Sequence, residues 1–119
     1  MTNVSKPVLY RNLIDRLVDV CHAGQGQIGA RRVRAGVWNA AATPLGNPDQ
    51  HEFNALLARL PNHDRDVIAR MISGEVELGV FETLKALEEF GVPPFNSGYE
   101  GSACNDFVGR LHGWEWPRN

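Results

Sequence analysis

The chain has 119 residues, of which 43% are hydrophobic and 22% are charged. These values are ordinary for a soluble globular protein, and the length predicts a single domain over residues 1–119 with one modest core. No apolar run approaches the roughly 20 residues of a membrane span, and the first residues hold no apolar segment of the signal-peptide type. Composition therefore excludes a membrane-spanning protein, and we expect a cytoplasmic one.

The net charge of −2 at pH 7 is distributed unevenly along the chain. Residues 1–34 carry six basic and two acidic side chains, whereas residues 62–119 carry five basic and ten acidic ones. Either the two ends face each other in the fold, or the basic end forms a face for an acidic partner.

The first predicted helix begins at about residues 5–7, and Gly24 can end it. One side of this helix is apolar and consists of Tyr10, Leu13, Ile14, Leu17, Val18 and Cys21. Cys21 and Cys104 both fall on apolar faces of predicted helices, which favours buried free thiols over a disulfide.

Residues 24–46 are the least regular part of the chain, with five glycines and one proline. We expect an extended, partly anchored loop there, which could include a short strand near residues 32–34. A structureless loop of this length is unusual in a compact domain, so it is either functional or partly ordered.

The next helix has a clear start. Asn47 is a favoured N-cap, Pro48 suits the first helical position, and Gln50 could close a capping box. The helix ends at Pro61, because the residue before a proline is disfavoured in helical conformation. Its apolar stripe consists of Phe53, Leu56, Leu57 and Leu60.

Asn62 can cap a further helix, so the short connection predicts two antiparallel helices with facing apolar stripes. Gly74 and Gly79 weaken the second stripe, and we expect a break or kink near Gly79. Residues 92–98 include two consecutive prolines and cannot be helical. The last predicted helix runs from about Gly101 to Leu111. The fold class is therefore all-α or mainly α, a compact bundle of four to five helices with one long irregular loop.

Residues 24–29 read GQGQIG and match the dinucleotide-binding fingerprint letter for letter. That fingerprint binds a pyrophosphate only between a preceding strand and a following helix. Here a helix precedes it, so we interpret it as a glycine-rich helix exit and expect no cofactor.

Asp15, Asp19 and His22 stand at i, i+4 and i+7 and share one helix face. Oxygen and nitrogen ligands at this spacing can hold a metal ion, which makes a metal-dependent hydrolase the first alternative function. They lie opposite the stripe of Leu13 and Leu17, however, and a solvated face accounts for them better. We assign no catalytic and no metal-binding residue.

Two groups of side chains are candidates for a partner surface. The first is Arg31, Arg32, Arg34 and Trp38. Guanidinium groups can meet phosphates and an indole can stack on a base, so weak nucleic-acid binding is the second alternative function. The pI near 6.0 argues against strong binding of that kind.

The second group is Trp114 and Trp116. A tail with two indoles either folds back over the core or forms a patch that anchors a partner. We predict a non-enzymatic protein-interaction module with no cofactor, whose partner is another protein. The sequence does not determine the oligomeric state, and a homodimer is one of the alternatives.

One set of residues extends over most of the chain: Leu13-Ile14-Asp15, Leu17-Val18, Asn47-Pro48-Asp49-Gln50, Asn54, Leu56, Leu57, Arg65, Val67, Ile68, Met71, Thr83-Leu84, Asp106-Phe107-Val108 and Glu115-Trp116-Pro117. In these residues the chain resembles a family of small bacterial proteins of unknown function. The resemblance implies a compact, mainly helical fold and carries over no activity and no catalytic residue. Residues 113–115 differ from the more polar tail of that family.

Overall fold

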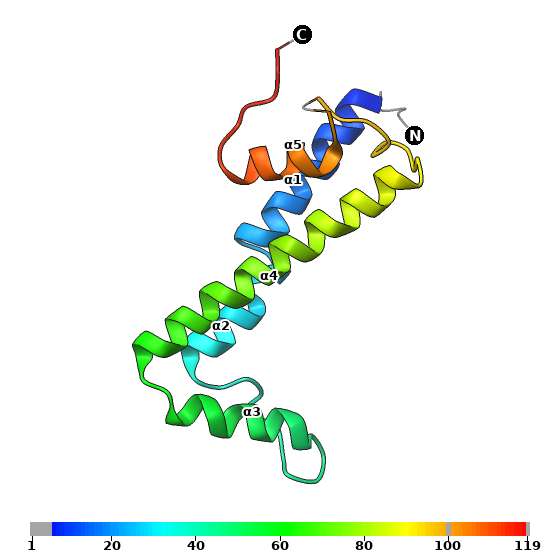
Figure 1. The fold of residues 1–119 in the computed structure, drawn as a ribbon. Coiled ribbons are helices and arrows are strands. Elements are labelled where there is room, and N and C mark those ends of the chain that lie inside the picture. Colours follow the sequence, from blue (N-terminus) through cyan, green and yellow to red (C-terminus); the bar gives the residue numbers. More distant parts are fainter. Residues whose placement is uncertain (1–5, 100, 119) are drawn as a thin grey trace.

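A computed structural model describes residues 6–99 and 101–118 (Figure 1). Within this part the chain forms five α-helices, one 3₁₀ turn and no strand. The elements are α1 (Lys6–His22), η1 (Gln25–Gln27), α2 (Ile28–Ala35), α3 (Pro48–Arg59), α4 (Asn62–Glu89) and α5 (Ala103–Leu111). The predicted mainly helical fold class is confirmed. None of the described helices is both long and apolar enough to cross a membrane.

The short strand considered near residues 32–34 is wrong, because those residues lie in helix α2. The helix ends at Gly36, whose φ of 80° is a left-handed conformation that glycine adopts without steric cost. Ala30 and Val33 are buried on one side of α2, and its three arginines are exposed. The predicted long loop is therefore partly ordered, and its irregular part begins only at Gly36.

Helix α4 runs without interruption for 28 residues, so the predicted break near Gly79 is also wrong. A Cβ atom added at Gly74 or Gly79 would have no heavy atom within 4 Å, which places both glycines on open surface. Their cost is one of helix propensity, about 1 kcal/mol each relative to alanine. The packing of α4 against its neighbours outweighs that cost.

Two apolar cores lie along α4. The first joins its second half to α1 and α5 and consists of Tyr10, Ile14, Cys21, Leu84, Ala103, Cys104 and Phe107. The second joins its first half to α2 and α3 and consists of Ala30, Val33, Leu57 and Ala69. Both cysteines are free and buried, as predicted.

The molecule is elongated, with extents of 53 × 29 × 28 Å. Its radius of gyration is 18.2 Å, whereas a compact chain of this length has about 13.5 Å. Helix α4 accounts for this shape, because 28 helical residues extend for about 42 Å.

The predicted antiparallel packing of α3 along α4 is found only in part, because Leu57 of α3 shares a core with Ala69 of α4 while the rest of the two helices does not pair closely. Helix α2 lies along the first half of α4 instead, and α3 diverges from α4 (Figure 1). The side chain of Asn54 holds α3 against the preceding loop, accepting from the backbone N–H of Trp38 at 2.7 Å and donating to the carbonyl of Asn39 at 2.7 Å. Gln50 does not close a capping box, because Asn47 makes no side-chain cap and the Gln50 amide oxygen accepts from the side chain of Asn39.

Because α4 is continuous and both of its glycines face open space, Gly74→Ala and Gly79→Ala should each raise the free energy of unfolding by up to about 1 kcal/mol. Urea unfolding measures this. Gly26→Ala is the control and should destabilise, since its Cβ would lie 2.6 Å from the carbonyl oxygen of Val20. A loss of stability in Gly79→Ala would contradict the unbroken helix.

Candidate binding groove

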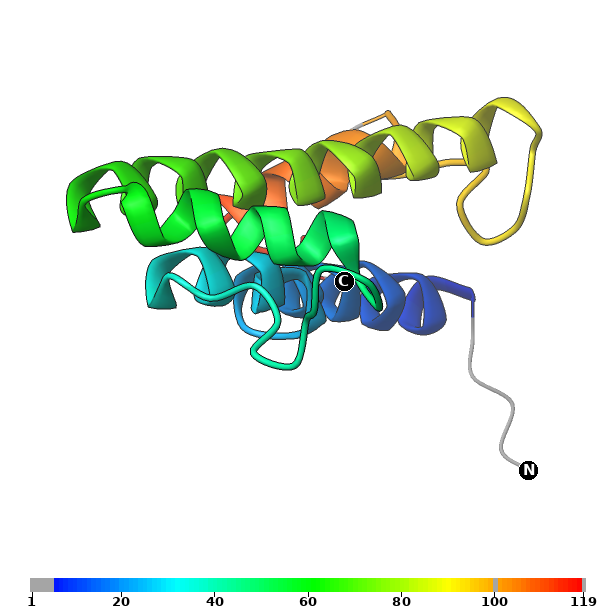
Figure 2. The same cartoon turned by 90° about the horizontal axis from the view of Figure 1, so that it is seen from below.

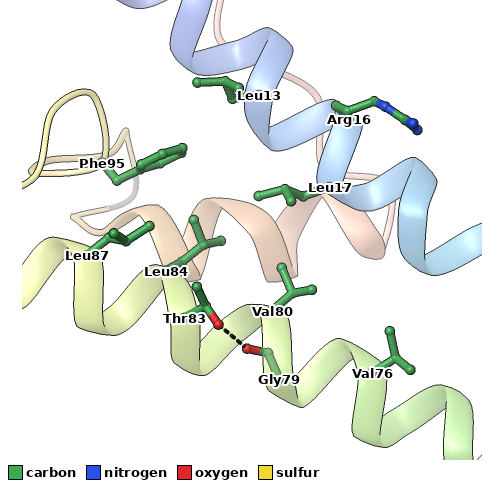
Figure 3. A pocket seen from close by; sticks show the side chains of 10 residues that line it. All are labelled: Leu13, Arg16, Leu17, Val76, Gly79, Val80, Thr83, Leu84, Leu87 and Phe95. Carbon is green, nitrogen blue, oxygen red and sulfur yellow. Dashed lines mark hydrogen bonds between the residues drawn. The ribbon is translucent and has the colours of Figure 1, made fainter. Parts of the chain in front are cut away.

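A groove of about 550 Å³ lies between α1 and the second half of α4 (Figure 3). The residues that line it are Leu13, Arg16, Leu17, Val76, Gly79, Val80, Thr83, Leu84, Leu87 and Phe95. Figure 3 shows Leu17 of α1 opposite Val80 and Leu84 of α4, while Phe95 closes one end from the loop that follows α4.

The sequence of α4 builds its side of the groove by spacing. Val76, Val80, Thr83 and Leu87 recur at intervals of four, three and four residues, the repeat with which helices interlock side chains. The hydroxyl of Thr83 donates to the carbonyl of Gly79 at 2.7 Å, so its hydrogen-bonding need is met within the helix. The groove therefore presents a nearly continuous apolar surface.

The chemistry of this lining suits binding rather than catalysis. Arg16 is the one charged side chain among the described residues that line the groove, and it is exposed at the rim. An arginine stays protonated and cannot act as a general base. Apolar clefts of roughly 300–1,000 Å³ with few polar groups are typical of binding sites.

Another side of α1 is covered by the C-terminal tail. The indole N–H of Trp116 donates to one carboxylate oxygen of Asp15 at 3.0 Å, and Nε of Arg110 donates to the other at 2.7 Å. Arg110 also donates to the carbonyl of Trp114 at 2.6 Å, and the ring of Trp116 meets that of Tyr10 edge-on at 5.8 Å. Both tryptophans thus fold back onto the molecule, the first of the two predicted arrangements.

The contacts of the tail with Asp15 lie on the helix face for which metal binding was considered. Both oxygens of Asp15 are engaged by the tail, while Asp19 and His22 are exposed. In the described part of the chain no three His, Cys, Asp or Glu side chains converge to hold a metal ion. The metal-dependent hydrolase built on Asp15, Asp19 and His22 therefore has no site in this part of the chain.

The arginine group lies at the other end of the molecule (Figure 1). Arg34 pairs with Asp66 at 3.1 Å, and Asp66 also pairs with Arg70 at 3.2 Å. The hydrogen bond from Arg34, aided by Arg70, lowers the pKa of the Asp66 carboxyl. The guanidinium of Arg32 lies 5.7 Å from the ring centre of Trp38.

Exposed Arg31 completes this arginine group. The predicted partner surface is therefore two separate surfaces. One is formed by α2 and the loop that follows it, and the other by the tail that follows α5 (Figure 1).

Sequence analysis assigned no individual role to Asp106, which appeared only in the family resemblance and whose side chain is fully buried. Its carboxylate accepts from the hydroxyl of Tyr10 and from the backbone N–H of Tyr99 at 2.8 Å. Burial first, and then the Asp106 carboxylate, raise the pKa of the Tyr10 phenol far above its ordinary value. Asp106 thus ties α5 to α1 and to the preceding loop, outside the groove. Its burial could have been predicted from its position beside Phe107 on the apolar face of a short predicted helix.

Comparison with protein families identifies the class of this chain. Residues 4–118 match a family of unknown function, DUF6547, and the chain belongs to that family. The predicted resemblance to a domain of unknown function is confirmed. No curated protein and no solved structure gives a significant match.

The Tyr10–Asp106 contact leads to a prediction about pH. Tyr10→Phe should lower the free energy of unfolding at pH 7 by roughly 1–3 kcal/mol, because the buried carboxylate loses a donor. The folded chain raises the pKa of this phenol, so the stabilisation is fully present below about pH 10, the ordinary tyrosine value. It is lost as pH rises further, because the unfolded chain then ionises first.

Urea unfolding between neutral and alkaline pH measures both chains. The difference in stability between wild type and Tyr10→Phe should narrow above about pH 10. A difference that stays constant with pH would contradict the contact.

Proposed function

We propose that the protein is a non-enzymatic protein-interaction module and that its groove between α1 and α4 binds an apolar helical segment. The observation that carries this proposal is the lining of the groove, which is aliphatic along both helices and holds one charged side chain, Arg16, at its rim.

The dimensions of the groove favour a helix as the bound segment. The lining residues of α4 run from Val76 to Leu87, which is about 16 Å at 1.5 Å per residue, or three helical turns. Amphipathic helices bind in apolar grooves of this kind through anchors at i, i+3 or i+4, and i+7. The 3.5-residue repeat on α4 provides the matching holes.

Of the other predicted features, only Trp38 is part of the proposal, and the rest remain predictions. Trp38 is half-buried against Phe53 of α3, with ring centres 6.0 Å apart, and we retain it as part of the partner surface at that end. The role of Trp114 and Trp116 in partner binding stays a prediction, as does a cytoplasmic location. Weak nucleic-acid binding through Arg31, Arg32 and Arg34 also stays an alternative.

A photo-reactive residue placed in the groove tests the proposal. We would replace Thr83, exposed at the groove, by p-benzoylphenylalanine in the full chain and irradiate it in the source cell. The expected result is a covalent adduct with a polypeptide. The same probe at the neighbouring Glu82, which is exposed but does not line the groove, is the matched control and should give little adduct.

The adduct should also disappear when Gly79→Arg fills the groove with a charged side chain. Absence of any polypeptide adduct at position 83, or equal adducts at both probe positions, would contradict the proposal.

A further inference from the structure

Helix α3 and the groove lie on the same side of the molecule, in different halves. Figure 1 shows α3 on the side of α4 opposite α5, next to the first half of α4. Figure 3 shows α5 on the far side of the groove from the viewer. In Figure 2, the view onto this side, α3 lies in front and the far parts of α1 and α4 extend beyond it. The molecule thus has a projection and a recess side by side.

The projection has an apolar face that is only partly covered, by the ring of Trp38 against Phe53. Phe53 and Leu56, at i and i+3 on α3, are each 46% exposed, and Leu57 is the one buried residue of this helix. Glu52 and Arg59 lie beside them and are exposed. Helix α3 thus carries apolar side chains flanked by charged ones on its outer side, in addition to the apolar side chain that it buries on its inner side.

We propose that the groove binds helix α3 of a second copy of this chain, in a reciprocal antiparallel dimer. This inference rests on the proposed function of the groove. Helix α3 has 12 residues, and the stretch of α4 that lines the groove, from Val76 to Leu87, has the same number, so the two match in length. In a two-fold dimer each α3 enters the groove of the partner, so both faces are covered twice and the assembly closes on itself.

Charge favours the antiparallel arrangement. Residues 28–74, the half of the molecule that contains α3, carry six basic and four acidic side chains and are net basic. Residues 75–89 of α4, beside the groove, carry five glutamates and one lysine. Antiparallel alignment brings each basic half to the acidic half of the other copy, whereas parallel alignment would oppose like charges.

A single small groove buries little surface, whereas a reciprocal dimer buries two α3 faces and two grooves at once. A stable interface buries roughly 1,200–2,000 Å² in total, or roughly 300–500 Å² for each of the two α3 faces and two grooves. Half-buried Trp38 packs against Phe53 of the α3 face and extends it with an aromatic side chain of the kind enriched at interface hot spots.

Sedimentation velocity on the full chain tests the inference. Wild type should sediment as a dimer, with twice the chain mass of 13.2 kDa. Gly79→Arg should halve the mass, because it places a charged side chain in the groove at a position where an added Cβ meets no heavy atom within 4 Å. Gly74→Arg is the matched control and should stay dimeric. Its position is equally open but lines a different hollow, between α4 and α5.

A mixing experiment distinguishes reciprocal exchange from contact between two α3 helices. Leu56→Glu damages the α3 face and leaves the groove intact, whereas Gly79→Arg does the reverse. Each variant alone should be monomeric, and their mixture should form a heterodimer with one intact contact. A mixture that remains monomeric would overturn the inference.

The inference also fails if wild type is monomeric, or if Gly74→Arg dissociates the dimer and Gly79→Arg does not. A monomeric wild type that gives a position-83 adduct with a different polypeptide would overturn the dimer and leave the proposed function standing. Absence of any adduct would overturn both. Circular dichroism of each variant should show wild-type helicity, so that loss of the dimer is not loss of the fold.

Discussion

Helix α4 is the constraint on which the rest of the structure depends. Its first half buries Ala69 against α2 and α3, and its second half buries Leu84 against α1 and α5. The small side chain of Ala69 and the larger side chain of Leu84 each fill a core with different neighbouring helices. Because one unbroken helix serves both cores, the molecule is long, and neither core can shift along the axis without the other. The space between α1 and the second half of α4, and the divergence of α3, follow from this arrangement.

Three carboxylates hold parts of the fold together. Asp106 holds Tyr10, Asp15 holds the tail through Arg110, and Asp66 holds Arg34. These three carboxylates are distributed along the molecule and engaged by structural partners. The groove and the outer side of α3, by contrast, present apolar side chains. This contrast is why binding, and not catalysis, is the function that we propose.

Local chemistry in the sequence was sufficient to place most helices. Pro48 and Pro61 mark their boundaries through the fixed geometry of proline, which needs no tertiary information. Gly79 misled the prediction because the packing of a long helix outweighs about 1 kcal/mol of propensity. Helix α2 was missed because its buried face is short and its three arginines mask the pattern. The groove and the Asp106 contact with Tyr10, 96 positions away, depend on how helices assemble, which no local pattern encodes.

The central claim is that α4 couples the two cores into one cooperative unit. Native-state hydrogen exchange in increasing, sub-denaturing urea tests it most directly, because it reports the free energy at which each helix opens. The amides around Ala69, those around Leu84 and those of the intervening turns of α4 should all merge into the same global unfolding transition. Separate opening of α2 and the first half of α4, at a lower free energy than the half that contains Leu84, would contradict the account.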